Sequence, residues 1–86
     1  MPEISRFFGI VIRMYFNEHG PPHFHAEYAK SKAQVRIEPV GIVRGRLPPR
    51  ALSLVVEWAT RYSSQLRENW RRLRSGELPM PIPPLE

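Results

Sequence analysis

The sequence contains no cysteine, and this absence removes two common ways of stabilising a short chain. Neither a disulfide bond nor a thiolate metal site can form, so the 86 residues depend on a hydrophobic core and on hydrogen bonds. A chain of this length has room for one domain and buries only ~60% of the surface that its unfolded form exposes. The lack of cysteine also suits a reducing compartment, and we expect a cytoplasmic protein.

Several features that would assign a class of function are also missing. Residues 1–6 lack the basic start and the apolar run of a secretion signal, and the longest apolar stretch, residues 7–12, falls short of the ~18 residues of a membrane span. The chain has no glycine-rich phosphate loop, dinucleotide-binding fingerprint, serine-nucleophile motif or internal repeat. We therefore expect no membrane partner and no cofactor.

Positive charge is abundant but unevenly distributed along the chain, whose net charge is +5. Residues 44–76 carry eight arginines and two glutamates, whereas residues 77–86 carry two glutamates and no basic residue. Arginine binds phosphate or carboxylate groups through a planar fork of donors, which lysine lacks. The charge pattern favours either nucleic acid or an acidic protein as partner, and a merely solvated helix face is the simpler alternative.

Alternation of apolar and polar residues predicts an N-terminal sheet. Four segments alternate with a period of two and are separated by residues that favour turns: 7–16, about 23–29, 33–38 and about 42–46. Short connections favour antiparallel neighbours. The sequence therefore predicts an antiparallel sheet of three to four strands.

After Pro49 the apolar residues follow a helical period, at positions 52, 55, 56, 59, 62, 66, 70 and 73. Trp58 lies at the edge of this stripe, and we expect both Trp58 and Trp70 to be core residues rather than base-stacking platforms. A single helix of ~27 residues would be ~40 Å long. We therefore expect one kinked helix or two helices, with a break near Tyr62-Ser63-Ser64, where either serine could cap the second helix.

Proline recurs at alternate positions near the C-terminus and excludes both helix and interior strand there. The predicted fold class is thus α+β, with a single domain over residues 1–76 and an extended, proline-rich tail over residues 77–86.

Two histidines and a glutamate share one side of the predicted strand 23–29. His23, His25 and Glu27 occur at every second position, about 6.6 Å apart along the strand, and His19 lies in the preceding turn. Imidazole and carboxylate groups bind transition metals and transfer protons near neutral pH. This row is the candidate site, and we weigh three interpretations of it.

In the first interpretation the protein binds or cleaves nucleic acid, most naturally RNA. One histidine acts as general acid or base and Glu27 orients it. The predicted phosphate-binding arginines come from the strands and from the helical segment: Arg36, Arg44, Arg46, Arg67 and Arg71.

The second interpretation is a metal site formed by His23, His25 and Glu27, with or without His19. In the third interpretation the histidines are ordinary polar residues on a solvated face, or the surface only binds a partner protein. The sequence leaves open whether the protein is an enzyme. An exposed edge of the sheet would also allow a homodimer.

The segment Pro21-Pro22-His23-Phe24-His25-Ala26-Glu27-Tyr28 is highly specific, and other matching positions span nearly the whole chain: 4–12, 47–48, 50–52, 57–59, 66 and 69–70. On these residues the chain resembles a family of small bacterial proteins known as domain of unknown function 4160. The resemblance transfers no established activity to any residue. Such proteins are often encoded beside another small protein, so the resemblance implies a two-gene module of the toxin–antitoxin kind. From the charge pattern we expect the partner to be a small acidic protein that covers the arginine-rich surface.

Overall fold

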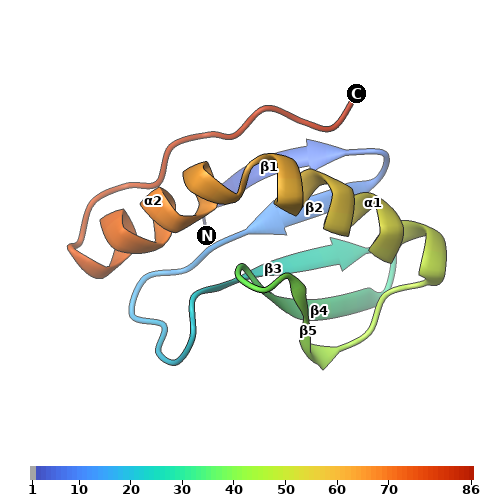
Figure 1. The fold of residues 1–86 in the computed structure, drawn as a ribbon, viewed down its shortest axis with the longest axis horizontal. Helices are drawn as coiled ribbons and strands as arrows, with labels where there is room; N and C mark the ends of the chain where they lie inside the picture. Colours follow the sequence, from blue (N-terminus) through green and yellow to red (C-terminus); the bar gives the residue numbers. More distant parts are fainter. Residues whose placement is uncertain (1) are drawn as a thin grey trace.

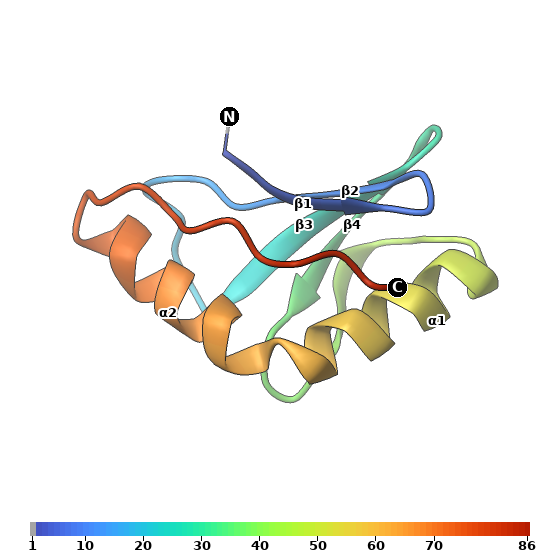
Figure 2. The same ribbon diagram turned by 90° about the horizontal axis from the view of Figure 1, so that it is seen from above.

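The computed structural model describes residues 2–86 as a five-stranded antiparallel sheet followed by two helices (Figure 1). The sheet has the order β1-β2-β3-β4-β5, and both helices lie on one side of it (Figure 2). The elements are β1 (Glu3–Phe7), β2 (Ile10–Arg13), β3 (His23–Tyr28), β4 (Ser31–Arg36), β5 (Gly41–Gly45), α1 (Pro49–Arg61) and α2 (Ser63–Arg74). The α+β class is confirmed, whereas the prediction of three to four strands is wrong.

The additional strand arises from a tight turn inside an apolar run. Phe8 and Gly9 have positive φ values of 49° and 80°, the combination that a two-residue hairpin turn requires. The turn pairs Phe7 with Ile10, so the predicted strand 7–16 is replaced by β1 and a short β2.

The core lies between the helices and the sheet. Trp58 of α1 is fully buried, and its ring lies 5.3 Å from that of Phe7 and 5.7 Å from that of Phe24. Both tryptophans are core residues, as predicted, since Trp70 is only 8% exposed. The placement of Trp58 at the edge of the apolar stripe is wrong, because the sheet covers this side chain.

The helical segment breaks at Tyr62, whose φ of −112° and ψ of 29° separate α1 from α2. This position agrees with the predicted break. Neither serine caps α2, because Tyr62 occupies the N-cap position and no side chain there bonds to the helix. Within residues 2–86 neither helix combines the length and the apolar composition that crossing a membrane requires.

The C-terminal segment, residues 77–86, contains neither helix nor strand and runs alongside β1 (Figure 1). The Ile82 N–H donates to the Ile4 carbonyl oxygen at 2.8 Å, and the side chains of Ile82 and Leu85 are buried. The segment therefore shields part of the outer edge of β1 and leaves β5 as the uncovered edge of the sheet. The division into a domain of residues 1–76 and a tail stays a prediction.

Candidate functional site

The candidate site forms where the chain returns from β2 to the start of β3. Gly20 adopts a φ of 90°, and the two prolines that follow fix the entry into β3. Along β3, Phe24 and Ala26 are buried under the helices, so His23 and His25 point to the opposite face of the strand.

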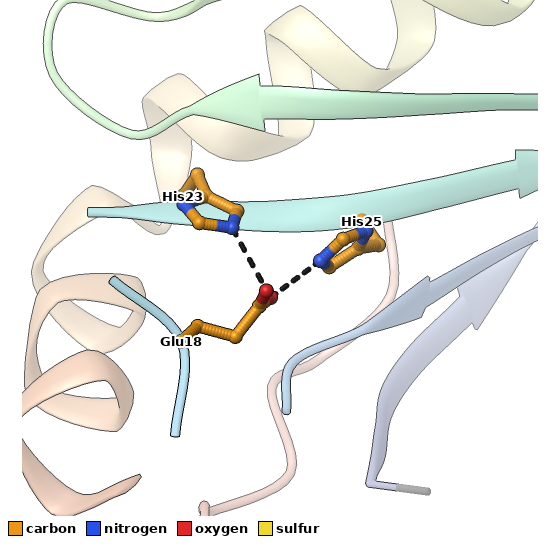
Figure 3. Close-up of side chains that lie close together, drawn as sticks. All are labelled: Glu18, His23 and His25. Atoms are coloured by element: carbon orange, nitrogen blue, oxygen red, sulfur yellow. Dashed lines mark hydrogen bonds and ion pairs between the residues drawn. The ribbon is translucent and has the colours of Figure 1, made fainter. Parts of the chain in front are cut away.

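A third residue, Glu18, joins the two histidines from the connecting segment (Figure 3). Its Oε1 atom lies 3.1 Å from His23 Nε2 and 2.5 Å from His25 Nε2. One potential ligand atom from each residue lies within 4.8 Å of the others. We refer to Glu18, His23 and His25 as the Glu–His–His cluster.

The structure does not bring Glu27 or His19 into this cluster. The Glu27 carboxylate lies 3.4 Å from Arg13 Nε and pairs with that guanidinium. His19 is exposed on the connecting segment. His25 and Glu27 lie on one face of β3, as the predicted row requires, but the carboxylate that contacts the histidines comes from Glu18 in the connecting segment. The catalytic and metal-binding roles of His23, His25 and Glu27 stay predictions.

Sequence reasoning missed Glu18 because it lies in a segment that the sequence marks only as a turn. Strand periodicity relates residues on one strand but says nothing about a side chain that approaches from a connection. The sequence does contain one indication of this contact. Glu18 lies five residues before His23, and Gly20 and the two prolines turn the intervening segment back towards β3.

The hydrogen-bond partners of His23 indicate which of its ring nitrogens faces the Glu18 carboxylate. His23 Nδ1 lies 3.0 Å from the Pro21 carbonyl oxygen, which can only accept, so Nδ1 carries a hydrogen. In a neutral His23 the remaining nitrogen, Nε2, then has a lone pair that faces the Glu18 carboxylate. Two acceptors at this distance repel each other unless a proton or a metal ion lies between them.

The cluster is mostly shielded from water, which strengthens this requirement. The side chains of His23, His25 and Glu18 are 9%, 20% and 24% exposed. The His23 ring packs 5.1 Å from that of Trp70, and the His25 ring lies edge-on to that of Tyr15 at 4.6 Å. Burial in a low dielectric raises the energetic cost of leaving the acceptors unpaired.

Partial burial also raises the pKa of Tyr15 above its usual value of 10.0, and the nearby Glu27 carboxylate adds to the effect. The Tyr15 phenol therefore keeps its proton at neutral pH and can donate a hydrogen bond beside the cluster.

A row of side chains crosses the open face of the sheet at the level of His25. The register aligns Arg13 of β2, His25 of β3, Gln34 of β4 and Arg44 of β5. Directly paired residues in antiparallel strands project on the same face, so the row places an arginine on each flank. We call these four residues the cross-strand row.

A shallow hollow of about 240 Å³ lies over part of the row. The side chains that line it with titratable or amide groups are Tyr15, His25, Glu27, Lys32, Gln34 and Arg44. His25 therefore belongs to both the hollow and the Glu–His–His cluster.

The other predicted arginines are less available for phosphate. Arg36 lies opposite His23, but its Nε donates to the Pro39 carbonyl oxygen at 3.0 Å. Arg67 of α2 pairs with Glu38 at 2.6 Å, and Arg71 pairs with Glu68 at 2.6 Å. The sequence alone treats Arg67 and Arg71 as free cations, whereas in the fold each of them pairs with a carboxylate. Arg46 is exposed beyond β5.

The fold and the cluster together define a small α+β protein with two histidines and a glutamate gathered at the start of its central strand. The family model described as Domain of unknown function (DUF4160) matches residues 9–71, and the chain belongs to this family. No curated protein and no solved structure matches significantly. The predicted family is confirmed, and family membership by itself assigns no activity.

Proposed function

We propose that this protein binds one transition-metal ion, zinc by preference, through Glu18, His23 and His25. The observation that supports the proposal is the approach of Glu18 Oε1 to 3.1 Å from His23 Nε2, while His23 Nδ1 lies 3.0 Å from the Pro21 carbonyl oxygen. With its hydrogen on Nδ1, a neutral His23 directs the Nε2 lone pair at the carboxylate. A metal ion between the three ligand atoms removes the repulsion and bonds to all of them.

The donor set suits zinc. Two imidazole nitrogens and one carboxylate oxygen form the ligand set of several catalytic zinc sites, and soft thiolate ligands are not required. Ligands at 2.0–2.1 Å from a tetrahedral ion lie about 3.3 Å apart. The contacts of Glu18 with the two Nε2 atoms, at 3.1 Å and 2.5 Å, would have to open to reach that spacing, and all three ligand atoms already lie within 4.8 Å of one another.

The surroundings of His23 resemble those of a metal-binding histidine. Such residues usually donate their second ring N–H to a carbonyl or carboxylate, which fixes the ring orientation and the tautomer. The Pro21 carbonyl supplies this acceptor for His23. Three protein ligands leave a fourth position for water, and a zinc-bound water loses its proton near pH 7, which would provide a nucleophile or base.

Calorimetric titration of the tag-free, EDTA-treated protein with zinc chloride tests the proposal. We expect one equivalent to bind, and the Glu18→Gln and His25→Gln variants to lose at least 100-fold in affinity because each removes one ligand. The matched controls are Glu27→Gln and His19→Gln, which remove the same groups outside the cluster and should bind zinc like the wild type. Circular dichroism verifies that each variant is folded. Equal loss in Glu18→Gln and Glu27→Gln, or no binding by the folded wild type, refutes the proposal.

A second candidate function follows from the 2.5 Å contact between Glu18 and His25. A proton in place of the metal makes this contact a charge-assisted hydrogen bond, in which Glu18 orients His25 as a general acid or base. Such a pair could cleave RNA by activating a 2′-hydroxyl without a metal. Incubation of RNA with the protein in EDTA tests this candidate: we expect cleavage that His25→Ala abolishes, and it is refuted if EDTA prevents cleavage or if His25→Ala cleaves normally.

A further inference from the structure

We propose that the open face of the sheet binds single-stranded nucleic acid along the cross-strand row, with a phosphodiester beside His25. For the role of the Glu–His–His cluster the inference rests on the proposed function, and it names single-stranded nucleic acid as the substrate class of that cluster. The contacts from the arginines do not require the metal.

The register of the row places one arginine on each side of His25. Neighbouring strands lie about 4.8 Å apart, so the Cα atoms of Arg13 and Arg44 are separated by about 14 Å, with His25 between them. The length of an arginine side chain lets both guanidinium groups reach towards the middle of the row. Arg44 is therefore free to reach a phosphate in the middle of the row, whereas Arg13 already pairs with Glu27 and would have to leave that carboxylate to contact the same phosphate.

Among the residues that line the hollow, the unpaired charges favour an anion near Lys32 and Arg44. The Glu18 carboxylate, which contacts His25, lies outside this lining and disfavours an anion directly at His25 unless a cation neutralises it. Glu27 is the acidic residue that lines the hollow, and its carboxylate already pairs with Arg13. Lys32 and Arg44 also line the hollow, and among residues 2–86 neither has a carboxylate within ion-pairing distance. These two cations are therefore available to a ligand.

Neutral donors complete the surface. The Gln34 amide lies within the row, and the Tyr15 phenol lines the same hollow. Both groups can donate hydrogen bonds to phosphate or sugar oxygens, which make up much of nucleic-acid recognition.

The shape of the hollow favours an extended chain over a small enclosed ligand. Pockets that bury a drug-sized molecule have volumes of about 300–1,000 Å³, whereas the open hollow measures about 240 Å³. Proteins that bind single strands combine a positive groove with aromatic side chains on which bases stack. Tyr15, at the border of the hollow, provides such an aromatic surface.

The helical arginines, in contrast, do not form the better surface. Arg67 and Arg71 of α2 each pair with a carboxylate at 2.6 Å, so phosphate would have to displace a glutamate. We therefore place the binding site on the sheet face, where Lys32 and Arg44 share one hollow. Arg50 and Arg74 also have no carboxylate partner among residues 2–86, but they lie at opposite ends of the helical segment.

Fluorescence anisotropy with a 12-nucleotide, fluorescein-labelled RNA of mixed sequence tests the inference. We expect Arg44→Gln to weaken binding about tenfold, and to make the slope of log affinity against log salt less steep by about 0.7, because one phosphate contact on a single strand is lost. Lys32→Gln should act in the same direction. The control is Arg74→Gln, which removes an exposed arginine at the far end of α2 and should leave the slope unchanged. A DNA strand of the same sequence shows whether the 2′-hydroxyl contributes.

All measurements are made both in EDTA and with zinc, so that the two proposals fail separately. If zinc does not bind but the effect of Arg44→Gln persists in EDTA, the metal centre is refuted and the nucleic-acid surface stands. If Arg44→Gln and Arg74→Gln behave alike, or if neither strand binds the folded wild type at 100 mM salt, the nucleic-acid surface is refuted whatever the zinc titration shows.

Discussion

Replacement of Asn69 by alanine should weaken the attachment of the C-terminal segment to the helices and destabilise the fold. Asn69 is 1% exposed, and its amide forms two hydrogen bonds with the backbone of Met80. The Nδ2 group donates to the Met80 carbonyl oxygen at 2.8 Å, and Oδ1 accepts from the Met80 N–H at 2.7 Å. The side chain thus pairs with the extended segment as a neighbouring strand would.

The expected cost follows from these two bonds. Each contributes about 1–1.5 kcal/mol, and a buried group left without a partner costs about 1–3 kcal/mol. Alanine regains about 0.6 kcal/mol through its higher helix propensity. Release of the segment gives little relief, because it exposes Ile82 and Leu85, whose burial stabilises by about 1.5–3 kcal/mol each. The two bonds together contribute about 2–3 kcal/mol, and the gain in helix propensity lowers the loss to about 1.5–2.5 kcal/mol. Incomplete solvation of the unpaired Met80 groups raises the net loss again, to about 2–3 kcal/mol.

Urea denaturation monitored by tryptophan fluorescence measures this loss directly. For a chain of this size the change corresponds to a decrease in Tm of about 10–20 °C. The matched control is Gln65→Ala, an exposed amide on the same helix, which should change stability by less than about 0.5 kcal/mol. A loss below 1 kcal/mol for Asn69→Ala would refute the reasoning, because the two hydrogen bonds would then contribute nothing beyond a surface amide.

Three further predictions follow. Zinc at 100 times its Kd should stabilise the protein by about 2.7 kcal/mol and raise the Tm by about 10–20 °C, and thermal unfolding of Glu18→Gln should show no such rise. Gly45→Ala should cost about 1–3 kcal/mol in urea denaturation, because φ is +81° and the added Cβ would overlap the Lys32 carbonyl oxygen; an unchanged midpoint would contradict the contact. Because the pKa of Tyr15 is raised in the folded state, the free energy of unfolding should fall as the pH rises above 10 and passes the raised pKa. The urea midpoint should therefore fall between pH 9 and pH 11, and it should fall less for Tyr15→Phe than for the wild type.

The sequence predicts the elements whose periodicity is regular. The alternation of His23 to Tyr28 and the helical period after Pro49 both correspond to observed elements, and the break at Tyr62 follows from the limit on helix length. The turn at Phe8-Gly9 escapes detection because a bulky apolar residue adopts a positive φ there, which local preferences disfavour. The pairing of Phe7 with Ile10 and the burial of both side chains outweigh that preference, although Phe8 itself is exposed.

The candidate site is only half predictable for a similar reason. Strand geometry places His23 and His25 on one face, but the carboxylate between them comes from Glu18, whose position depends on the path of a loop. Glu27 has the correct spacing on the strand, yet Arg13 on the adjacent strand pairs with it. Pattern arguments within one segment cannot decide which of two carboxylates reaches a site.

One residue in the sequence, Asn69, indicates that the C-terminal segment packs on α2, although this becomes clear only from the structure. Asn69 lies three residues after Leu66, on the buried side of α2, where an amide needs a partner. The partner is the backbone N–H and carbonyl group of Met80. The prolines on either side keep this segment out of the sheet, so these backbone groups have no partner in a neighbouring strand within residues 2–86. A buried amide within an apolar stripe thus indicates that another backbone segment packs there.

The central claim is that Glu18, His23 and His25 form a metal site, and X-ray absorption at the zinc edge of the zinc-loaded protein tests it most directly. The account predicts nitrogen and oxygen neighbours at about 2.0 Å, with the multiple-scattering signal of two imidazoles. Glu18→Gln should remove the bound zinc while Glu27→Gln retains an identical spectrum. A spectrum with three imidazoles or with none, or an unchanged spectrum for zinc bound to Glu18→Gln, would contradict the account.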